Sequence, residues 1–348
     1  MKEALYQTFE DLLSDLNSRE IDIIKRRFGI DREKKESLGR IGMDFGLTRE
    51  RIRQIQDAIL GKIKAKFSST PFIKKIYEET EVYIGNLPVK REIYILENFS
   101  NNYSLEDNDK KILRLFLIIL PDYLYHKETK TYHSFLGKEN IFKEALSVLN
   151  NLHSTLSKKI FTEEEFLNFL EDNVKRIINV SPDVNELYEF AKILKKLGKN
   201  PLNEVGSIDH KRISPSSLID KIYLVFKLEK RPMHFTEVYE KLNKIKEIED
   251  DLISDGWKKD YSLQSVLNTL ISSDKFAWYG RGKYALKEDG YKDGNIIELM
   301  KEIVKKHNGI KADRLLELVS KQKAVSKNTF SVYLQKYFKK IDNRVYLK

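Results

Sequence analysis

The chain has 348 residues and a mass of 41.0 kDa, which is too long for one ordinary domain and enough for two or more. Hydrophobic residues make up 41% of it and aromatic residues 11%, so it has enough apolar surface to fold. With 15 glycines, 7 prolines and many Leu, Ile, Lys and Glu residues, the composition argues against turn-rich β-sandwiches, collagen-like repeats and long flexible linkers. It predicts a mainly α fold with short β-hairpins.

Cysteine is absent, which excludes disulfides, thiolate nucleophiles, iron–sulfur clusters and the usual structural zinc sites. The N-terminal residues contain no apolar stretch of signal-peptide length. The most apolar stretch, residues 112–120, contains Arg114 and is far too short to span a bilayer. We therefore expect a soluble, cytoplasmic protein that has no contact with membranes.

The formal net charge is +10, and the excess lies near the two ends. The net charge is +3 over residues 1–66, −1 over residues 67–290 and +8 over residues 291–348. Proteins gain affinity for nucleic acids from Lys and Arg side chains that neutralise phosphates, so this distribution indicates polyanion contact at both ends. A basic surface that only solubilises the protein is the alternative.

Residues 16–66 have the pattern of three short helices. Ser18 is predicted to cap the first helix and Gly29 to end it, whereas Ser37 and Thr48 are predicted to cap the second and third, with Gly46 in the turn between them. The apolar side chains expected to face the core recur at helical spacing: Ile21, Ile24, Phe28, Leu38, Ile41, Phe45, Ile52, Ile55 and Ile59. Two short helices joined by a Gly-containing turn form the helix-turn-helix layout.

The first two turns of the third helix carry side chains suited to reading base edges. Arg can make a bidentate contact to guanine, Gln to adenine, and Glu can accept a hydrogen bond from cytosine. Recognition helices use their N-terminal residues for such contacts. The polar residues here are Arg49, Glu50, Arg51, Arg53 and Gln54. A charged helix face exposed to solvent is the alternative interpretation.

This segment resembles region four of the bacterial primary sigma factor family. The resemblance rests on residues 48–55, Thr-Arg-Glu-Arg-Ile-Arg-Gln-Ile, preceded by Arg27-Phe-Gly-Ile-Asp and Ile41-Gly, and it covers about Leu16 to Lys64. In that family the domain reads the minus-35 promoter element and docks on the flap of the RNA polymerase beta subunit. The resemblance therefore implies double-stranded DNA as one partner and the RNA polymerase core as another.

The resemblance also implies a role for each polar residue of the third helix. Arg49, Glu50, Arg53 and Gln54 occupy the promoter-reading positions, and Arg51 and Lys62 lie near phosphates in that interpretation. Thr48, at the start of the helix, belongs to the same predicted DNA-binding set.

Three departures from the family pattern carry consequences of their own. Gly39-Arg40 stands where the family usually has an acidic pair, which weakens the second helix and adds positive charge. Region four normally ends a sigma factor, whereas about 280 residues follow it here. The aromatic segment that melts the promoter is missing, since the two tryptophans, Trp257 and Trp278, lie in unrelated contexts. We expect this chain not to start transcription alone, as an ordinary sigma factor does.

A pattern of a helix, a short apolar segment and a second amphipathic helix recurs after residue 66. Its copies begin near Val89, Phe161, Phe235 and Ile310, at intervals of 72, 74 and 75 residues. The near-constant interval predicts one module used four times. The first two copies are weaker, and chance alignment is the alternative for them.

The third copy predicts three helices, over residues 217–227, from residue 236 and over 262–273, followed by a hairpin around Gly-Arg-Gly-Lys. Three helices and a hairpin make a winged helix. The segment Arg231-Pro-Met-His-Phe with this hairpin resembles the HARE-type helix-turn-helix domain, a family related to the N-terminal domain of the RNA polymerase delta subunit. The resemblance covers about Ser214 to Tyr291 and implies association with nucleic acid or polymerase.

The fourth copy predicts helices over residues 295–307, 312–320 and 326–337 and a closing hairpin over 341–347. Its cations gather on the third helix and the hairpin, where a winged helix meets DNA. They are Lys323, Lys327, Lys336, Lys339, Lys340 and Arg344, with Tyr333 and Tyr346 among them. A basic face that only solubilises the module is the alternative.

A few residues of the chain are superficially compatible with an enzyme. Pro121-Asp122 followed by Glu128-Thr129-Lys130 is superficially similar to a Mg²⁺-dependent nuclease motif, but the gap is shorter than the usual strand–turn–strand path. His126 and His133 fit a wing hairpin better and have no third ligand nearby. Phosphate-binding glycine motifs and Gly-x-Ser-x-Gly are absent. The sequence predicts no enzymatic activity, no metal and no cofactor.

The predicted organisation has five segments: a sigma region-four-like helix-turn-helix (1–66), two helical or winged-helix-like modules (67–137 and 138–210), a HARE-like winged helix (211–290) and a basic winged helix (291–348). It predicts a sequence-specific, sigma-factor-like transcription regulator of the nucleoid that reads a minus-35-like element and lacks promoter-melting regions. The alternatives are an RNA-polymerase-associated adaptor or scaffold and the DNA-recognition subunit of a defence or mobile-element system.

Overall fold

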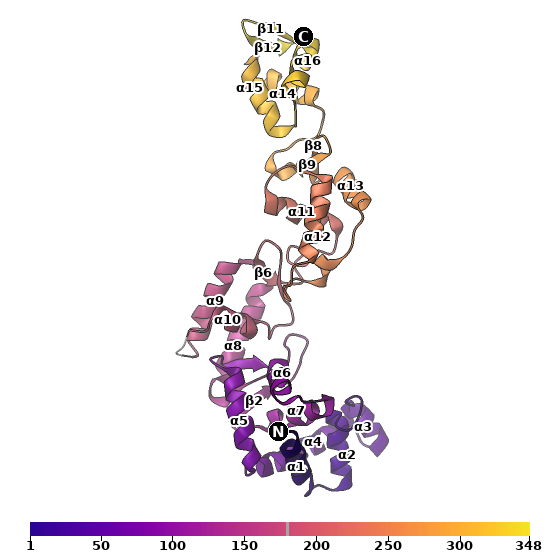
Figure 1. Cartoon of the computed structure of the whole chain (residues 1–348), viewed down its shortest axis with the longest axis vertical. Coiled ribbons are helices and arrows are strands. Elements are labelled where there is room, and N and C mark those ends of the chain that lie inside the picture. Colours follow the sequence, from indigo (N-terminus) through magenta and orange to yellow (C-terminus); the bar gives the residue numbers. More distant parts are fainter. Residues whose placement is uncertain (179–180) are drawn as a thin grey trace. The chain divides into compact units, whose positions relative to one another are not determined.

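The computed structural model describes residues 1–178 and 181–348 (Figure 1). The chain is mainly helical with small three-stranded sheets, which confirms the predicted mainly α composition with short β elements. It divides into two compact units, residues 1–197 (unit 1) and residues 198–348 (unit 2). Within the described ranges no helix combines the length and the apolar character needed to cross a bilayer.

Unit 1 is built mostly from helices. It opens with α1 (Lys2–Leu13), α2 (Ser18–Phe28), α3 (Leu38–Phe45), α4 (Arg49–Phe67) and α5 (Pro71–Ile84). It continues with β1 (Val89–Arg91), α6 (Glu92–Tyr103), α7 (Asp107–Ile119), β2 (Tyr123–His126), β3 (Phe135–Lys138), α8 (Glu139–Leu156), β4 (Phe161–Thr162), α9 (Glu163–Lys175) and α10 (Val184–Ala191).

Strand β5 (Leu197–Lys199) spans the boundary between the units, and the remaining elements lie in unit 2. They are β6 (Glu204–Ser207), α11 (Leu218–Glu229), β7 (Met233–His234), α12 (Phe235–Lys246), η1 (Asp255–Lys258), α13 (Leu263–Ser272), β8 (Phe276–Gly280), β9 (Lys283–Leu286), η2 (Lys287–Asp289), α14 (Ile296–His307), β10 (Ile310–Lys311), α15 (Ala312–Gln322), α16 (Lys327–Tyr337), β11 (Phe338–Ile341) and β12 (Arg344–Leu347).

The helix boundaries in residues 17–67 follow from capping side chains and glycines. Ser37 accepts from the backbone N–H of Arg40 and caps α3, and Thr48 accepts from that of Arg51 and caps α4, as predicted. Gly29 and Gly46, with φ of 73° and 62°, end α2 and α3 in the left-handed conformation, which glycine adopts without a Cβ penalty. These caps produce the predicted turn between α3 and α4.

The predicted cap of α2 was wrong. Asn17 caps the helix: its side chain accepts from the backbone N–H of Glu20 at 3.0 Å, and the Glu20 carboxylate accepts from the backbone N–H of Asn17 at 3.1 Å. This reciprocal capping box needs an acidic side chain at the third helical position, which Glu20 supplies to Asn17. Ser18 is therefore the first residue of the helix and not its cap.

Substituting Asn17 should destabilise unit 1 more than substituting Ser18. We expect Asn17→Ala to lower the free energy of unfolding by about 1 kcal/mol, because the first turn loses a partner for a backbone N–H. Ser18→Ala is the matched control and should have little effect. Urea unfolding followed by circular dichroism measures both values, and equal losses in the two variants would contradict the capping box.

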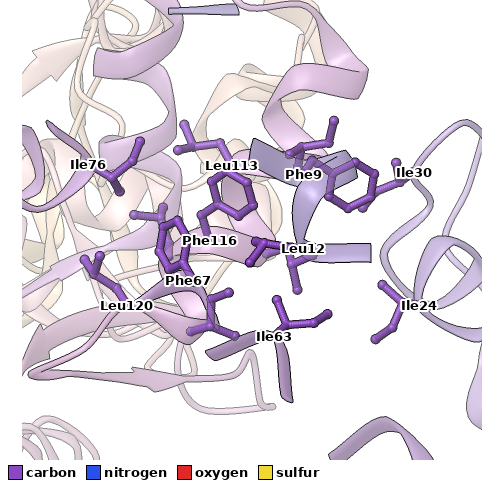
Figure 2. Packing of buried hydrophobic residues seen from close by; sticks show 14 of the residues in the cluster. Phe9, Leu12, Ile24, Ile30, Ile63, Phe67, Ile76, Leu113, Phe116 and Leu120 are labelled. Carbon is purple, nitrogen blue, oxygen red and sulfur yellow. The ribbon is translucent and has the colours of Figure 1, made fainter. Parts of the chain in front are cut away.

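One apolar core joins the helix-turn-helix to the elements that follow it. It takes buried residues from Leu5 in α1 to Leu136 in β3. Figure 2 shows Phe67 of α4 beside Phe116 of α7, and their ring centroids are 4.8 Å apart. Ile63, one turn earlier on α4, lies in the same cluster. Residues 1–66 therefore share their core with the first repeat.

The element order helix–strand–helix–helix–strand–strand occurs four times along the chain. The four copies are α5–β1–α6–α7–β2–β3, α8–β4–α9–α10–β5–β6, α11–β7–α12–α13–β8–β9 and α14–β10–α15–α16–β11–β12. In the first, third and fourth copies the short first strand pairs with the last strand, giving the sheet orders β1-β3-β2, β7-β9-β8 and β10-β12-β11. Their first strands begin at Val89, Met233 and Ile310.

The third and fourth repeats, both in unit 2, have separate apolar cores. Trp257 is buried in the core of the third repeat, where its indole N–H donates to the carbonyl of Ile213. Phe330, Phe338 and Val345 belong to the core of the fourth repeat. Each repeat therefore packs around its own apolar residues.

The C-terminal end of α15 and the turn that follows it are hydrogen-bonded to strand β8 of the preceding repeat. Lys323 is 0% exposed, and its ammonium donates to the carbonyl of Trp278 and lies 5.5 Å from the indole ring centroid. The backbone N–H of Ala324 donates to the carbonyl of Tyr279 at 2.8 Å, and the Tyr279 hydroxyl donates to the carbonyl of Ser320 at 2.9 Å. We call these contacts the Lys323 junction.

The burial of Lys323 corrects its predicted place on the exposed basic face. The side chain crosses to the neighbouring repeat, and burial lowers its pKa below the ordinary value for lysine. The backbone carbonyl and the indole face compensate part of the cost of burying the ammonium. Lys323 therefore links two repeats and is not available to a phosphate.

Candidate nucleic-acid interface

Helix α4 presents its predicted DNA-contacting side chains to solvent. Thr48, Arg49, Glu50, Arg51, Arg53, Gln54 and Lys62 are all exposed. Ile52 and Ile59, on the opposite face, are fully buried. A Cβ at Gly42 would lie 2.6 Å from the carbonyl oxygen of Leu47, so only glycine fits where α3 meets the turn into α4. The apolar face and this close approach together orient the polar row outward.

Two of the exposed arginines on α4 are already hydrogen-bonded within the helix. Arg53 makes a bidentate contact to Glu50, with its Nη2 2.7 Å from Oε1, and a second contact to Asp57 at 2.6 Å. This contact holds the pKa of Glu50 below its ordinary value. Arg51 donates to the side chain of Gln54 at 3.2 Å. To contact a base, Arg51 and Arg53 must give up these hydrogen bonds within the helix and form new ones to the DNA.

Arg49 differs from Arg53 in its surroundings. Over the described part of the chain, no carboxylate lies within ion-pair distance of its guanidinium. It is close enough to Arg27 on α2 for the two charges to repel. Arg49 interacts with Glu50 only at longer range, so its guanidinium has no direct carboxylate partner and is free to contact a phosphate or a guanine edge.

Lys62 lies away from the other predicted residues of α4. It is exposed near the C-terminal end of the helix, about 20 Å along the axis from Thr48 at 1.5 Å per residue. Its ammonium pairs with Glu20 of α2 at 2.8 Å. The structure thus groups Thr48 to Gln54 at one end of α4 and places Lys62 beside the N-terminus of α2.

The second predicted group of cations lies on α16 and the β11–β12 hairpin. Lys327 and Lys336 are exposed on α16, Lys339 and Lys340 on β11, and Arg344 on β12. Strands β11 and β12 pair antiparallel, with Lys339 opposite Tyr346 and Arg344 opposite Ile341. The sequence of α16 contains no acidic residue.

These five cations have no acidic partner among the described residues, where no carboxylate lies within ion-pair distance of any of them. The Lys336 ammonium makes a cation–π contact with Tyr337, lying 5.3 Å from the centroid of its ring. Tyr333 and Tyr346 are half-buried, and Tyr333 packs against the apolar core of the fourth repeat. We call Lys327, Lys336, Lys339, Lys340 and Arg344 the C-terminal basic face.

The two histidines and Glu128 of the nuclease-like motif make contacts within the fold. His126 stacks on Phe135 with ring centroids 4.6 Å apart, and burial lowers the pKa of both His126 and His133. Glu128 pairs with Lys195. In residues 1–178 and 181–348, no three His, Asp or Glu side chains gather closely enough to hold a metal ion.

Comparison with known proteins agrees with the geometry of the N-terminal segment. Residues 12–65 match the family described as "Sigma-70, region 4", which places α2, α3 and α4 in a helix-turn-helix DNA-binding domain. This segment is therefore a sigma-70 region 4 helix-turn-helix.

The relatives that match this segment are bacterial sigma factors. The "RNA polymerase sigma factor SigA" proteins of Listeria monocytogenes serovar 1/2a (strain ATCC BAA-679 / EGD-e) and of Listeria innocua serovar 6a (strain ATCC BAA-680 / CLIP 11262) are each 42% identical to this chain over 62 residues. The match covers 18% of this chain and 17% of each sigma factor. The similarity thus concerns one domain that the two kinds of chain have in common.

Proposed function

We propose that this chain is a sequence-specific DNA-binding transcription regulator whose helix-turn-helix reads a minus-35-like element with the N-terminal turns of α4. The observation that carries the proposal is the region 4 match combined with the exposed row Thr48 to Gln54. Arg49, Glu50, Arg53 and Gln54 would contact base edges, while Arg51 and Lys62 would contact phosphates. The chain would act through binding, without catalysis.

The four repeats are, in this proposal, winged-helix modules. Their element order supports it, because in a winged helix a third helix and a hairpin follow two helices and a short strand. The fourth module would place α16 and the β11–β12 hairpin against the DNA backbone, so that the C-terminal basic face supplies phosphate contacts. The near-neutral modules over residues 67–290 would serve as spacers or bind other proteins.

Sequencing the genomic fragments retained by the purified full-length protein, with and without core RNA polymerase, tests the proposal. Enrichment of minus-35-like sites by the protein alone is the expected result. Enrichment that requires polymerase would favour an adaptor that docks on RNA polymerase. A random set of fragments under both conditions would contradict sequence-specific reading.

Glu50→Ala and Lys340→Ala should affect DNA binding in different ways. Removing Glu50 removes one proposed base contact, so we expect discrimination at one base pair to fall by about 1–3 kcal/mol. Removing Lys340 should weaken binding to every sequence and reduce the salt slope by about 1. Fluorescence anisotropy on the enriched site and on a scrambled site, at three salt concentrations, separates the two effects.

The control for Lys340→Ala is Lys306→Ala, an equal charge change at an exposed position of α14 outside the C-terminal basic face. Similar behaviour of Glu50→Ala and Lys340→Ala on matched and scrambled sites would show that base reading and phosphate contact are not divided between the two regions.

A second candidate function is an adaptor that docks on RNA polymerase. It is favoured by the relatives, which are named RNA polymerase sigma factors, and by the engagement of Arg53 with Glu50 and Asp57. The variant Arg53→Ala/Gln54→Ala distinguishes the two functions. Loss of DNA binding with intact polymerase co-purification would show that polymerase docking does not depend on DNA reading.

A further inference from the structure

Unit 1 contains a hollow of about 570 Å³ between the helix-turn-helix and the first repeat. Helices α2 and α4 form one wall with Arg27, Phe28 and Leu60. The first repeat forms the other with α7, β2 and the residues that follow β2, including Tyr125 and Lys127. A hollow of this size accommodates a ligand as large as a nucleotide.

The cations around the hollow outnumber the acidic groups that can neutralise them. Its two carboxylates are already engaged: buried Glu92 accepts from Arg114, Tyr125 and Ser134, and Glu128 pairs with Lys195. Glu128 is also close enough to Lys35 for an electrostatic attraction, although the two do not form an ion pair. The lining as a whole still carries more cations than carboxylates.

Arg27, Lys35 and Lys127 are the remaining cations of this lining. Arg27 donates to two neutral acceptors, the side chain of Gln56 and the carbonyl of Glu36. For Lys35 and Lys127, as for Arg27, no carboxylate of the described residues lies within ion-pair distance. Burial and the nearby charge of Arg49 lower the pKa of Arg27, in keeping with a site of positive potential. Such a site attracts an anion.

The inner surface is partly apolar and aromatic. Phe28, Leu60 and Ile118 line it together with the half-buried ring of Tyr125. An inorganic anion would leave this surface without a partner. A ligand with a flat ring at one end and phosphates at the other would fill it and reach the three cations.

We propose that this hollow binds a phosphorylated small molecule of the nucleotide class. The ring would lie against Phe28, Leu60 and Tyr125, and the phosphates would contact Lys35 and Lys127 at the rim, with Arg27 behind them. Residues 48–54 of α4 do not line the hollow, and the proposal does not rest on whether the chain reads DNA.

Titration of the full-length protein with a fluorescent nucleoside triphosphate, followed by competition with unlabelled nucleotides and inorganic phosphate, tests the proposal. The informative variant is Lys35→Glu/Lys127→Glu, since both side chains are exposed at the rim and their replacement should not disturb packing. We expect it to weaken binding at least about tenfold, because two charge-assisted contacts are lost.

The matched control is Lys34→Glu/Lys130→Glu, which makes the same charge change at exposed positions outside the hollow. It should stay within about twofold of the unmodified protein, since long-range charge effects are screened by salt. Lys35→Gln/Lys127→Gln provides a milder variant if circular dichroism shows that the double Glu variant is unfolded.

Three results would overturn the proposal. They are no binding at millimolar nucleotide, equal losses in the rim and control variants, and competition by inorganic phosphate as strong as that by nucleotides. The last would show an unspecific anion site without recognition of the ring.

Discussion

Phe116→Ala is expected to destabilise the helix-turn-helix and the first repeat together, by about 3–5 kcal/mol. Phe116 is fully buried on α7 and contacts Phe67 of α4 and Phe72 of α5. Removing its ring leaves a cavity between elements that belong to different predicted segments. Because these elements share one core, the loss should appear in both.

Hydrogen exchange resolved along the chain measures this effect directly. Protection should fall by a similar free energy in α2–α4 and in α6–α7. Met43→Ala is the control, since Met43 is 71% exposed on α3 and its removal leaves no cavity. Loss of protection in α6–α7 alone, with α2–α4 unchanged, would show that the helix-turn-helix folds separately despite the shared core.

Neutralising three cations of the C-terminal basic face should reduce affinity for any duplex about 10- to 100-fold at low salt. The variant is Lys327→Gln/Lys340→Gln/Arg344→Gln, and each side chain that contacts a phosphate contributes about 0.9 to the salt slope. The slope of log K against log salt should therefore fall by up to about 2.7. Anisotropy titrations on two unrelated duplexes measure both quantities.

The control variant is Lys301→Gln/Lys305→Gln/Lys306→Gln, which removes the same charge from exposed positions of α14. It should lower affinity only slightly, because these side chains lie outside the basic face. If both triple variants lost the same affinity and slope, net charge alone would account for DNA binding, and the face would have no specific role.

Local features of the fold were predictable where one or two neighbouring residues determine them. Ser37, Gly46 and Thr48 act within four residues of their own position, and the structure confirms all three. The cap of α2 was missed because Asn17 and Ser18 are both good caps. The spacing of Asn17 to Glu20 was the available signal, since only Asn17 has an acidic residue three positions later.

Features that depend on contacts distant in the sequence were not predictable. Lys323 lies in a strongly basic segment, and its burial depends on a carbonyl 45 residues away. The shared core likewise required Phe67 and Phe116 to meet, which no local pattern indicates. In contrast, the pairing of Arg53 with Glu50 and Asp57 follows from their spacing of three and four residues on one helix.

The hollow beside α4 could not be predicted from the sequence either, because it too depends on residues that are distant in the chain. Its cations come from α2, from the segment after it and from the residues that follow β2, so no continuous motif contains them. Arg27 belongs to the sigma-like run, whereas Lys35 and Lys127 belong to no motif in the sequence. Their common surroundings exist only once the first repeat packs against the helix-turn-helix.

The Lys323 junction should reduce the orientational entropy that the fourth repeat loses when it binds a partner. A module on a free tether loses orientational freedom when it settles on a surface, and that loss reduces its affinity. The fourth repeat is already oriented against the third by hydrogen bonds from Lys323, Ala324 and Tyr279. Its cations are thus held in one orientation relative to the third repeat. If they bind a polyanion as proposed, the loss of orientational entropy on binding would be smaller than for a freely tethered module.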